Sequence, residues 1–183
     1  MKILRFFSLG VFTALFLITG GALLLPSTYH VNQKIIIKSK ADKIFPEINN
    51  LRNWDKWAFM TDNDVQRLSP TFTGPDEGVG ATHSWLNYSG SKADLRILAS
   101  EPFDKVVLQM TTNDGAFTSD IAFDIQSNQN GCVVTWQEKG DFGYQLAARV
   151  IAFMSDYETK IGAQYQLALE QLKFTVENGE TIE

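Results

Sequence analysis

The chain has 183 residues, of which 44% are hydrophobic and 20% charged, and its formal net charge is −5 at pH 7. This is ordinary globular usage, with enough apolar material to offset chain entropy, so intrinsic disorder over the whole chain is excluded. The acidic balance argues against a dedicated nucleic-acid-binding protein, because phosphate contacts need a surplus of Lys and Arg. The single cysteine, Cys132, excludes an internal disulfide.

The chain begins with a long uncharged segment. Residues 6–25 are 20 residues without a charge, and a helix of this length spans roughly 30 Å, the thickness of the hydrocarbon core of a bilayer. Lys2 and Arg5 precede the segment and Pro26 follows it. We interpret residues 1–26 as a single-pass membrane anchor, and the positive charges before it favour an extracytoplasmic location for the rest of the chain. A signal peptide cleaved after Ala22 and a buried core helix are the alternatives.

The remainder of the chain is more acidic than the whole. Because the first 26 residues carry two basic residues and no acid, residues 27–183 have a net charge of −7. A domain of this charge is not attracted to anionic lipid headgroups. We divide it into one domain over residues 27–176 and a polar tail over residues 177–183 that is expected to fray.

The pattern after the anchor predicts one strand, two short helices, six further strands and one long helix. The first strand covers residues 29–38, and the short helices cover residues 39–48 and 51–58. Apolar and polar residues then alternate between turn-like separators, which predicts antiparallel strands. These strands are residues 66–73, 81–88, 93–100, 105–112, 117–126 and 132–139.

The last segment has apolar residues at spacings of three and four, which predicts one long amphipathic helix over residues 145–178. The predicted strands have one apolar and one polar face, and the helix can cover the apolar face. The sequence therefore predicts an α+β helix-grip fold, a curved antiparallel sheet of about seven strands wrapped around a long C-terminal helix. Gly162 costs this helix about 1 kcal/mol relative to Ala, which a close approach to the sheet or a bend would explain.

The order of these segments resembles the SRPBCC superfamily, which has the START and birch-pollen-allergen-like fold. The likeness is to polyketide cyclase/dehydrase-like proteins with an N-terminal membrane segment. It implies an internal apolar cavity between sheet and helix that binds lipids or other hydrophobic molecules, in members that include lipid carriers and aromatase/cyclases. The residues that carry it are Leu25-Pro26 and the strand to Ile37, Ala41–Phe45, Trp54-Asp55-Lys56-Trp57, Gly74, Gly78–Ala81, Trp85, Val133–Trp136, Ile161-Gly162, Tyr165, Leu169 and Leu172-Lys173.

Large apolar side chains on the inner face and the helix are the candidates for lining such a cavity. Flat aromatic rings and adaptable methionines suit the surface of a hydrophobic ligand, but the same residues are equally suited to ordinary core packing. The candidates are Trp54, Trp57, Trp85, Leu95, Ile97, Leu108, Met110, Phe117, Ile121, Phe123, Trp136, Val150, Phe153, Met154 and Tyr157.

Polar candidates for a pocket are few. Glu138, Arg149 and Asp156 are the groups that we consider, with surface salt links as the alternative. Asp94, Asp120 and Asp124 fall on the polar face of the predicted sheet, which makes them poor pocket acids.

No catalytic constellation is visible in the sequence. His30 and His83 have no second His or Cys at ligand spacing, so no metal is assigned. His83 is interpreted as a structural residue and Cys132 as a buried strand residue, because no histidine is placed to activate the thiol. No catalytic residue and no cofactor is assigned.

Three functions follow as hypotheses. The first is a membrane-tethered domain that binds a hydrophobic small molecule or lipid. The second is a cyclase- or aromatase-like enzyme of the same fold, which needs at least two polar groups in the cavity. The third is a non-catalytic interaction module of the cell envelope with a collapsed cavity, which a large exposed apolar patch would favour.

Overall fold

A computed structural model of the chain describes residues 10, 13, 16, 19–58, 68–87 and 90–179. Half of the predicted anchor over residues 6–25 lies outside this part of the chain, and residues 19–24 are helical. Among the described residues, no helix is both long and apolar enough to cross a membrane.

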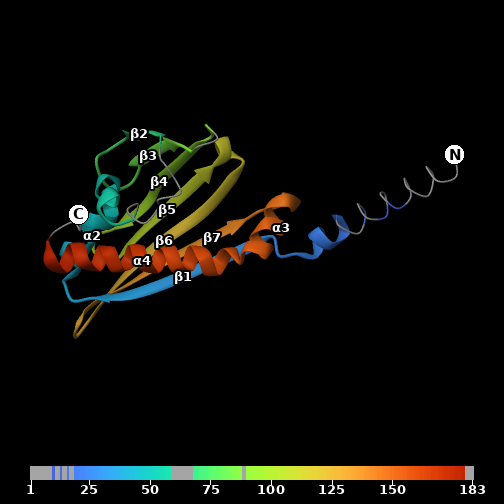
Figure 1. The fold of residues 1–183 in the computed structure, drawn as a ribbon. Coiled ribbons are helices and arrows are strands. Elements are labelled where there is room, and N and C mark those ends of the chain that lie inside the picture. Colours follow the sequence, from blue (N-terminus) through green and yellow to red (C-terminus); the bar gives the residue numbers. More distant parts are fainter. Residues whose placement is uncertain are drawn as a thin grey trace, which may run out of the picture.

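Seven strands form one antiparallel sheet in the order β1-β7-β6-β5-β4-β3-β2. The sheet curves around α4, and α2 lies at the opposite end of the sheet from α3 (Figure 1). The predicted antiparallel sheet is thereby confirmed, with strand ends within about two residues of those expected, the precision normal for such boundaries. The strands are β1 (Thr28–Ile37), β2 (Leu68–Thr73), β3 (Thr82–Leu86), β4 (Lys92–Glu101), β5 (Lys105–Thr112), β6 (Phe117–Asn128) and β7 (Gly131–Asp141).

The alternation in the sequence sets which side chains face the core. On β6, Ser119, Ile121, Phe123 and Ile125 are buried, whereas Thr118 and Asp120 on either side of Ser119 are exposed. This is the pattern of a sheet with one covered and one solvated face.

Two short helices close one end of the sheet. They are α2 (Ala41–Asn49) and the 3-10 helix η1 (Leu51–Lys56). The indole nitrogen of Trp54 donates to the carbonyl of Ile48 at 2.9 Å, and that of Trp57 donates to the carbonyl of Glu47 at 3.1 Å. These hydrogen bonds let both tryptophans be fully buried without leaving an unpaired donor there.

The predicted long C-terminal helix is broken into two. α3 (Leu146–Ser155) and α4 (Tyr157–Asn178) meet at Asp156, whose backbone is left-handed with φ 49° and ψ 57°. A single helix over residues 145–178 is therefore wrong as predicted, because this residue turns the chain between the two helices. Helix α4 also continues past the predicted domain end, and Glu177 accepts a hydrogen bond from the backbone amide of Lys38. Residues 180–183 of the predicted tail lie outside the described residues.

Gly162 lies where α4 crosses β1. A Cβ at this position would stand 2.7 Å from the side-chain nitrogen of Gln33 and 3.7 Å from Val31. The close approach to the sheet that the sequence suggested for this glycine is confirmed.

Candidate functional site

The interior beside α2 and η1 is filled by aromatic rings. We call Trp54, Trp57, Phe123 and Trp136 the aromatic core, because their ring centroids lie 4.8–6.0 Å apart. Each is at most 4% exposed. Tyr165 of α4 stacks on Trp136 with a centroid distance of 3.9 Å. These rings pack against one another in the way expected of a core.

Most of the other cavity candidates belong to the same packed region. Trp85, Leu95, Ile97, Leu108 and Ile121 are buried in the hydrophobic core, and Met110 packs against it half-buried.

A pocket lies at the other end of the sheet, where α3 meets the start of α4. It has a volume of about 290 Å³, close to the lower limit of small-molecule sites. Of the cavity candidates, Phe153 and Tyr157 line it. We call it the α3 pocket, and its lining is Pro26, Thr28, Tyr29, Phe142, Arg149, Ala152, Phe153, Asp156, Tyr157 and Glu158.

Aromatic rings form one wall of the α3 pocket. The Tyr29 ring lies 5.3 Å from that of Phe142 and 5.0 Å edge-on from that of Tyr157. Phe117, a cavity candidate, stacks behind them on Phe142 at 5.3 Å. Two more candidates lie on α3: Val150 is half-buried, and Met154 is 80% exposed.

A buried carboxylate lies behind this wall. Glu138 of β7 is 5% exposed, and the Tyr29 hydroxyl donates to it at 2.5 Å. The Tyr165 hydroxyl of α4 donates to its other oxygen. Burial raises the pKa of Glu138, and hydrogen bonds from Tyr29 and Ser119 oppose the shift without cancelling it. Glu138 thus holds a proton more readily than an exposed glutamate does.

Tyr29 connects this carboxylate to the pocket, because it lines the pocket and hydrogen-bonds Glu138. Burial, followed by the charge of Glu138, raises the pKa of Tyr29, so its hydroxyl stays protonated and remains a donor. The ring lies directly on Gly140, where a Cβ would be only 2.4 Å from a ring carbon. A glycine on the neighbouring strand is what makes room for the tyrosine.

Arg149 and Asp156 both line the pocket, as the sequence suggested for polar pocket groups. The Arg149 guanidinium donates to the carbonyl of Gly143 at 2.7 Å and to that of Leu25 at 3.3 Å. Its bonds go to backbone carbonyls of the segments around the pocket, so it fixes the pocket wall. Asp156 is exposed at the rim.

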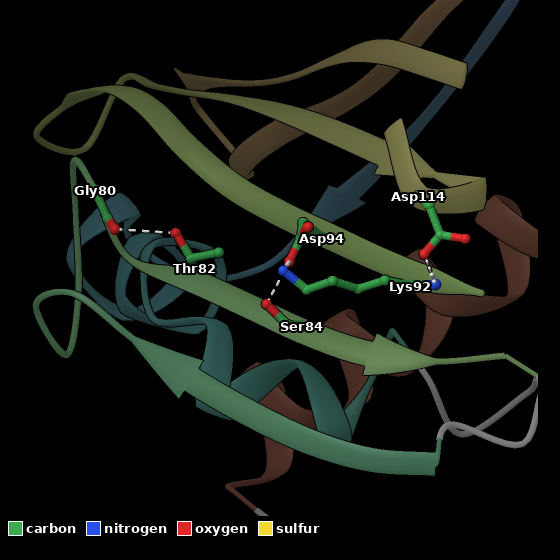
Figure 2. Close-up of polar contacts among 6 residues, drawn as sticks. All are labelled: Gly80, Thr82, Ser84, Lys92, Asp94 and Asp114. Carbon is green, nitrogen blue, oxygen red and sulfur yellow. Dashed lines mark hydrogen bonds and ion pairs between the residues drawn. The ribbon is translucent and has the colours of Figure 1, made fainter. Parts of the chain in front are cut away.

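The carboxylates predicted on the polar face of the sheet lie there. Asp94 accepts a hydrogen bond from Ser84 and pairs with Lys92 at 2.9 Å on the outer side of β3 and β4 (Figure 2). Burial raises the pKa of Asp94, but the hydrogen bonds and charge of its two partners outweigh burial and leave the pKa lowered. The Lys92 amide is in turn bound by Asp114 at 2.9 Å (Figure 2). This polar network belongs to the outer surface and takes no part in the pocket.

The remaining single candidates are structural. His83 is fully buried, and its ring stacks on Phe72 with a centroid distance of 4.4 Å. Cys132 is a buried thiol. Among the described residues, no group of three His, Cys, Asp or Glu could hold a metal ion.

Sequence reasoning missed Tyr29 and Phe142 of the pocket wall, and it missed Gly140, on which the Tyr29 ring lies. One signal was present in the sequence. Tyr29 stands two residues before the inward-facing Val31, and Glu138 two residues after Trp136, so each shares the buried face of its strand. The pairing of β1 with β7, which places Tyr29 opposite Gly140, is not readable from local patterns.

Comparison with known proteins shows the fold. No protein-family model matches the chain, and no curated protein matches it. SA2116 from Staphylococcus aureus, a protein of unknown function, matches with a TM-score of 0.60 and 7% identity over 83% of this chain and 95% of that one.

Two further solved structures have a similar fold. DynU16, a protein in the dynemicin biosynthetic locus, matches with a TM-score of 0.55 and 12% identity over 83% of this chain, which spans about half (48%) of its length. CalU16 from Micromonospora echinospora matches with a TM-score of 0.50 and 13% identity over 83% of this chain and 77% of that one. These likenesses show that the chain shares the α+β fold of these proteins, a curved antiparallel sheet packed on a C-terminal helix.

Proposed function

We propose that the α3 pocket binds a hydrophobic small molecule or lipid and that the N-terminal segment tethers the domain to a membrane. The observation that carries the ligand proposal is the pocket of about 290 Å³ walled by Tyr29, Phe142, Phe153 and Tyr157. Burying apolar ligand surface against such rings contributes about 25 cal/mol per Å². Because the aromatic core fills the interior beside α2 and η1, the end of the sheet near α3 is the better supported ligand site.

The lining also favours a ligand with one polar end. Arg149, Asp156 and Glu158 stand at the pocket together with the four rings. Small-molecule sites commonly combine an apolar wall with a few polar groups that fix orientation. A fatty alcohol or a similar amphipathic molecule with a hydrogen-bond donor at its polar end suits both parts of the lining, because Asp156 and Glu158 are acceptors.

The test is photo-crosslinking of the full chain in membranes with a diazirine-bearing fatty alcohol. We expect labelling of peptides that contain Tyr29, Phe142 or Tyr157, and we expect excess unlabelled fatty alcohol to remove it. Labelling by bulk lipid does not saturate, so competition distinguishes the pocket from simple contact with a bilayer. Labelling of these peptides that is absent, or that resists competition, would refute the ligand proposal.

Gly140→Ala and Gly162→Ala form a matched pair of variants for this test. A methyl group at position 140 pushes on the Tyr29 ring, and such overpacking costs about 1–3 kcal/mol of stability. At position 162 it meets only the flexible end of Gln33, and the higher helix propensity of Ala offsets the clash. Competable labelling should fall several-fold in Gly140→Ala and remain at the parent level in Gly162→Ala.

A cyclase-like enzyme is the second candidate, favoured by the buried Glu138. Its raised pKa and its hydroxyl partners suit a group that gives and takes a proton. The molecules extracted from the parent chain and from Glu138→Gln should then differ in mass or isomeric form, as mass spectrometry and chromatography would show. Identical extracts would leave binding alone as the function.

A further inference from the structure

The outward face of α3 is apolar and uncovered. Ala147, Ile151 and Met154 follow one another at spacings of four and three, so they lie along one side of the helix, and Tyr144 stands just before its first turn. Tyr144 is 90% exposed, Ile151 66% and Met154 80%. We call these four residues the α3 stripe. A surface helix of a water-soluble domain normally places polar residues on this side.

The α3 stripe is also free of charge. Arg149 is the one charged residue of α3, and its guanidinium turns to the carbonyls of Gly143, Leu23 and Leu25 instead of the outer side. No carboxylate lies within the helix.

The same arginine binds α3 to the end of the N-terminal helix. Its Nη1 lies 3.4 Å from the carbonyl oxygen of Leu23 and 3.3 Å from that of Leu25. A cation at the C-terminal carbonyls of a helix is a stabilising arrangement. Figure 1 shows this N-terminal helical segment leaving the domain at the end where α3 lies. Through Arg149, α3 is therefore held beside Leu23 and Leu25, where the N-terminal segment joins the domain.

Exposed apolar side chains gather at this end. More than half of the exposed large hydrophobic side chains among the described residues lie on the N-terminal segment, Tyr144 and α3; they are Phe16, Leu23, Leu24, Tyr144, Ile151, Phe153 and Met154. Contiguous patches of this kind mark surfaces that contact a partner or a membrane.

We propose that the α3 stripe lies in the surface of the lipid bilayer that residues 6–25 enter, so that the α3 pocket opens beside that surface. This inference rests on the proposed tether and does not depend on which ligand the pocket holds. The end of the uncharged segment lies beside the patch, because Arg149 of α3 hydrogen-bonds the carbonyls of Leu23 and Leu25, and this favours lipid as the occupant. A second copy fits less well: ten residues of helix present roughly 15 Å by 10 Å, far less than the roughly 800 Å² per partner of a stable dimer.

The test places a fluorescent probe on the stripe of the full chain. Met154→Cys and the control Leu167→Cys are labelled with a polarity-sensitive dye in phosphatidylcholine liposomes. Leu167 is likewise apolar and 51% exposed, but it lies well along α4 from α3. Cys132 is buried, so the parent chain measures background labelling. Quenching is compared between a phosphatidylcholine carrying a nitroxide near its headgroup and iodide in the water.

We expect the probe at position 154 to be quenched at least two-fold by the nitroxide lipid and protected from iodide, with the reverse at position 167. If the chain does not float with the liposomes, both the tether and this inference are overturned. If it floats but the two probes respond alike to iodide, only this inference fails. A probe at position 154 that is protected from both quenchers would show a protein partner and would also overturn it, while competable labelling of the pocket can succeed or fail independently.

Discussion

At the scale of the residue, Glu138 departs most from what its type normally does. A glutamate on the inner face of a strand is expensive unless its oxygens are hydrogen-bonded. Here the hydroxyls of Tyr29 and Tyr165 donate to its two oxygens from β1 and α4. The carboxyl therefore joins a strand and a helix that are far apart in the sequence.

The burial of Glu138 predicts a pH-dependent stability. Its folded pKa is raised, so its contribution is most favourable below its ordinary pKa of 4.5 and is lost as the pH rises through the folded pKa. Glu138→Gln cannot ionise and should gain stability relative to the parent across this range, by about 1.4 kcal/mol for each unit of raised pKa.

Urea unfolding of both chains over a series of pH values measures this gain. The pKa of Glu47 is also raised by burial, but this contribution is the same in both chains and cancels in the difference between their free energies of unfolding. A difference that does not change with pH would mean that Glu138 titrates normally in the folded chain.

At the scale of the element, the break between α3 and α4 is the main departure from the sequence-based prediction. The apolar spacing runs without interruption through Val150, Met154, Tyr157 and Ile161, so periodicity alone predicts one helix. The break depends on the backbone of Asp156, and aspartate adopts the left-handed conformation more readily than most residues. A glycine there would have been a visible stop signal, whereas an aspartate is not.

The conformation of Asp156 can be tested by substitution. Asp156→Val should destabilise the chain by about 1–2 kcal/mol, because a β-branched residue is strained at positive φ. Asp156→Gly should stay within about 0.5 kcal/mol of the parent. Denaturant unfolding followed by circular dichroism compares the three chains. Equal stability of the Val variant and the parent would contradict a left-handed residue at the junction.

At the scale of the whole molecule, local patterns predicted much of the fold and little of the site. Period-two alternation and turn residues placed the strands, because each is a property of neighbouring residues. The α3 pocket is assembled from the starts of β1 and α4, α3 and the residue after β7, and only the tertiary pairing brings these together. Trp57 and Trp136 were candidates for a ligand cavity because of their flat rings, but in the structure these rings pack against each other.

The charge of the whole chain predicts how it should respond to salt. With a net charge of −7 after residue 26, the membrane contact that we propose should be apolar. Raising NaCl from about 0.05 M to about 0.5 M shortens the Debye length several-fold, and we expect flotation of the full chain with phosphatidylcholine liposomes to be unchanged. Loss of flotation at high salt would show an electrostatic attachment in place of an apolar one.

The pairing of β1 with β7 also bears on how the chain folds. Thr28 pairs with Asp141 and Ile37 with Cys132, so among the described strands the first one has a single sheet neighbour, which follows about a hundred residues later. Contacts this distant along the chain slow folding, because the intervening loop must close before they form. During synthesis, β1 therefore waits for its pairing with β7 until β7 has emerged. The apolar N-terminal segment is synthesised before either strand, so the tether that we propose can enter a membrane before the sheet is complete.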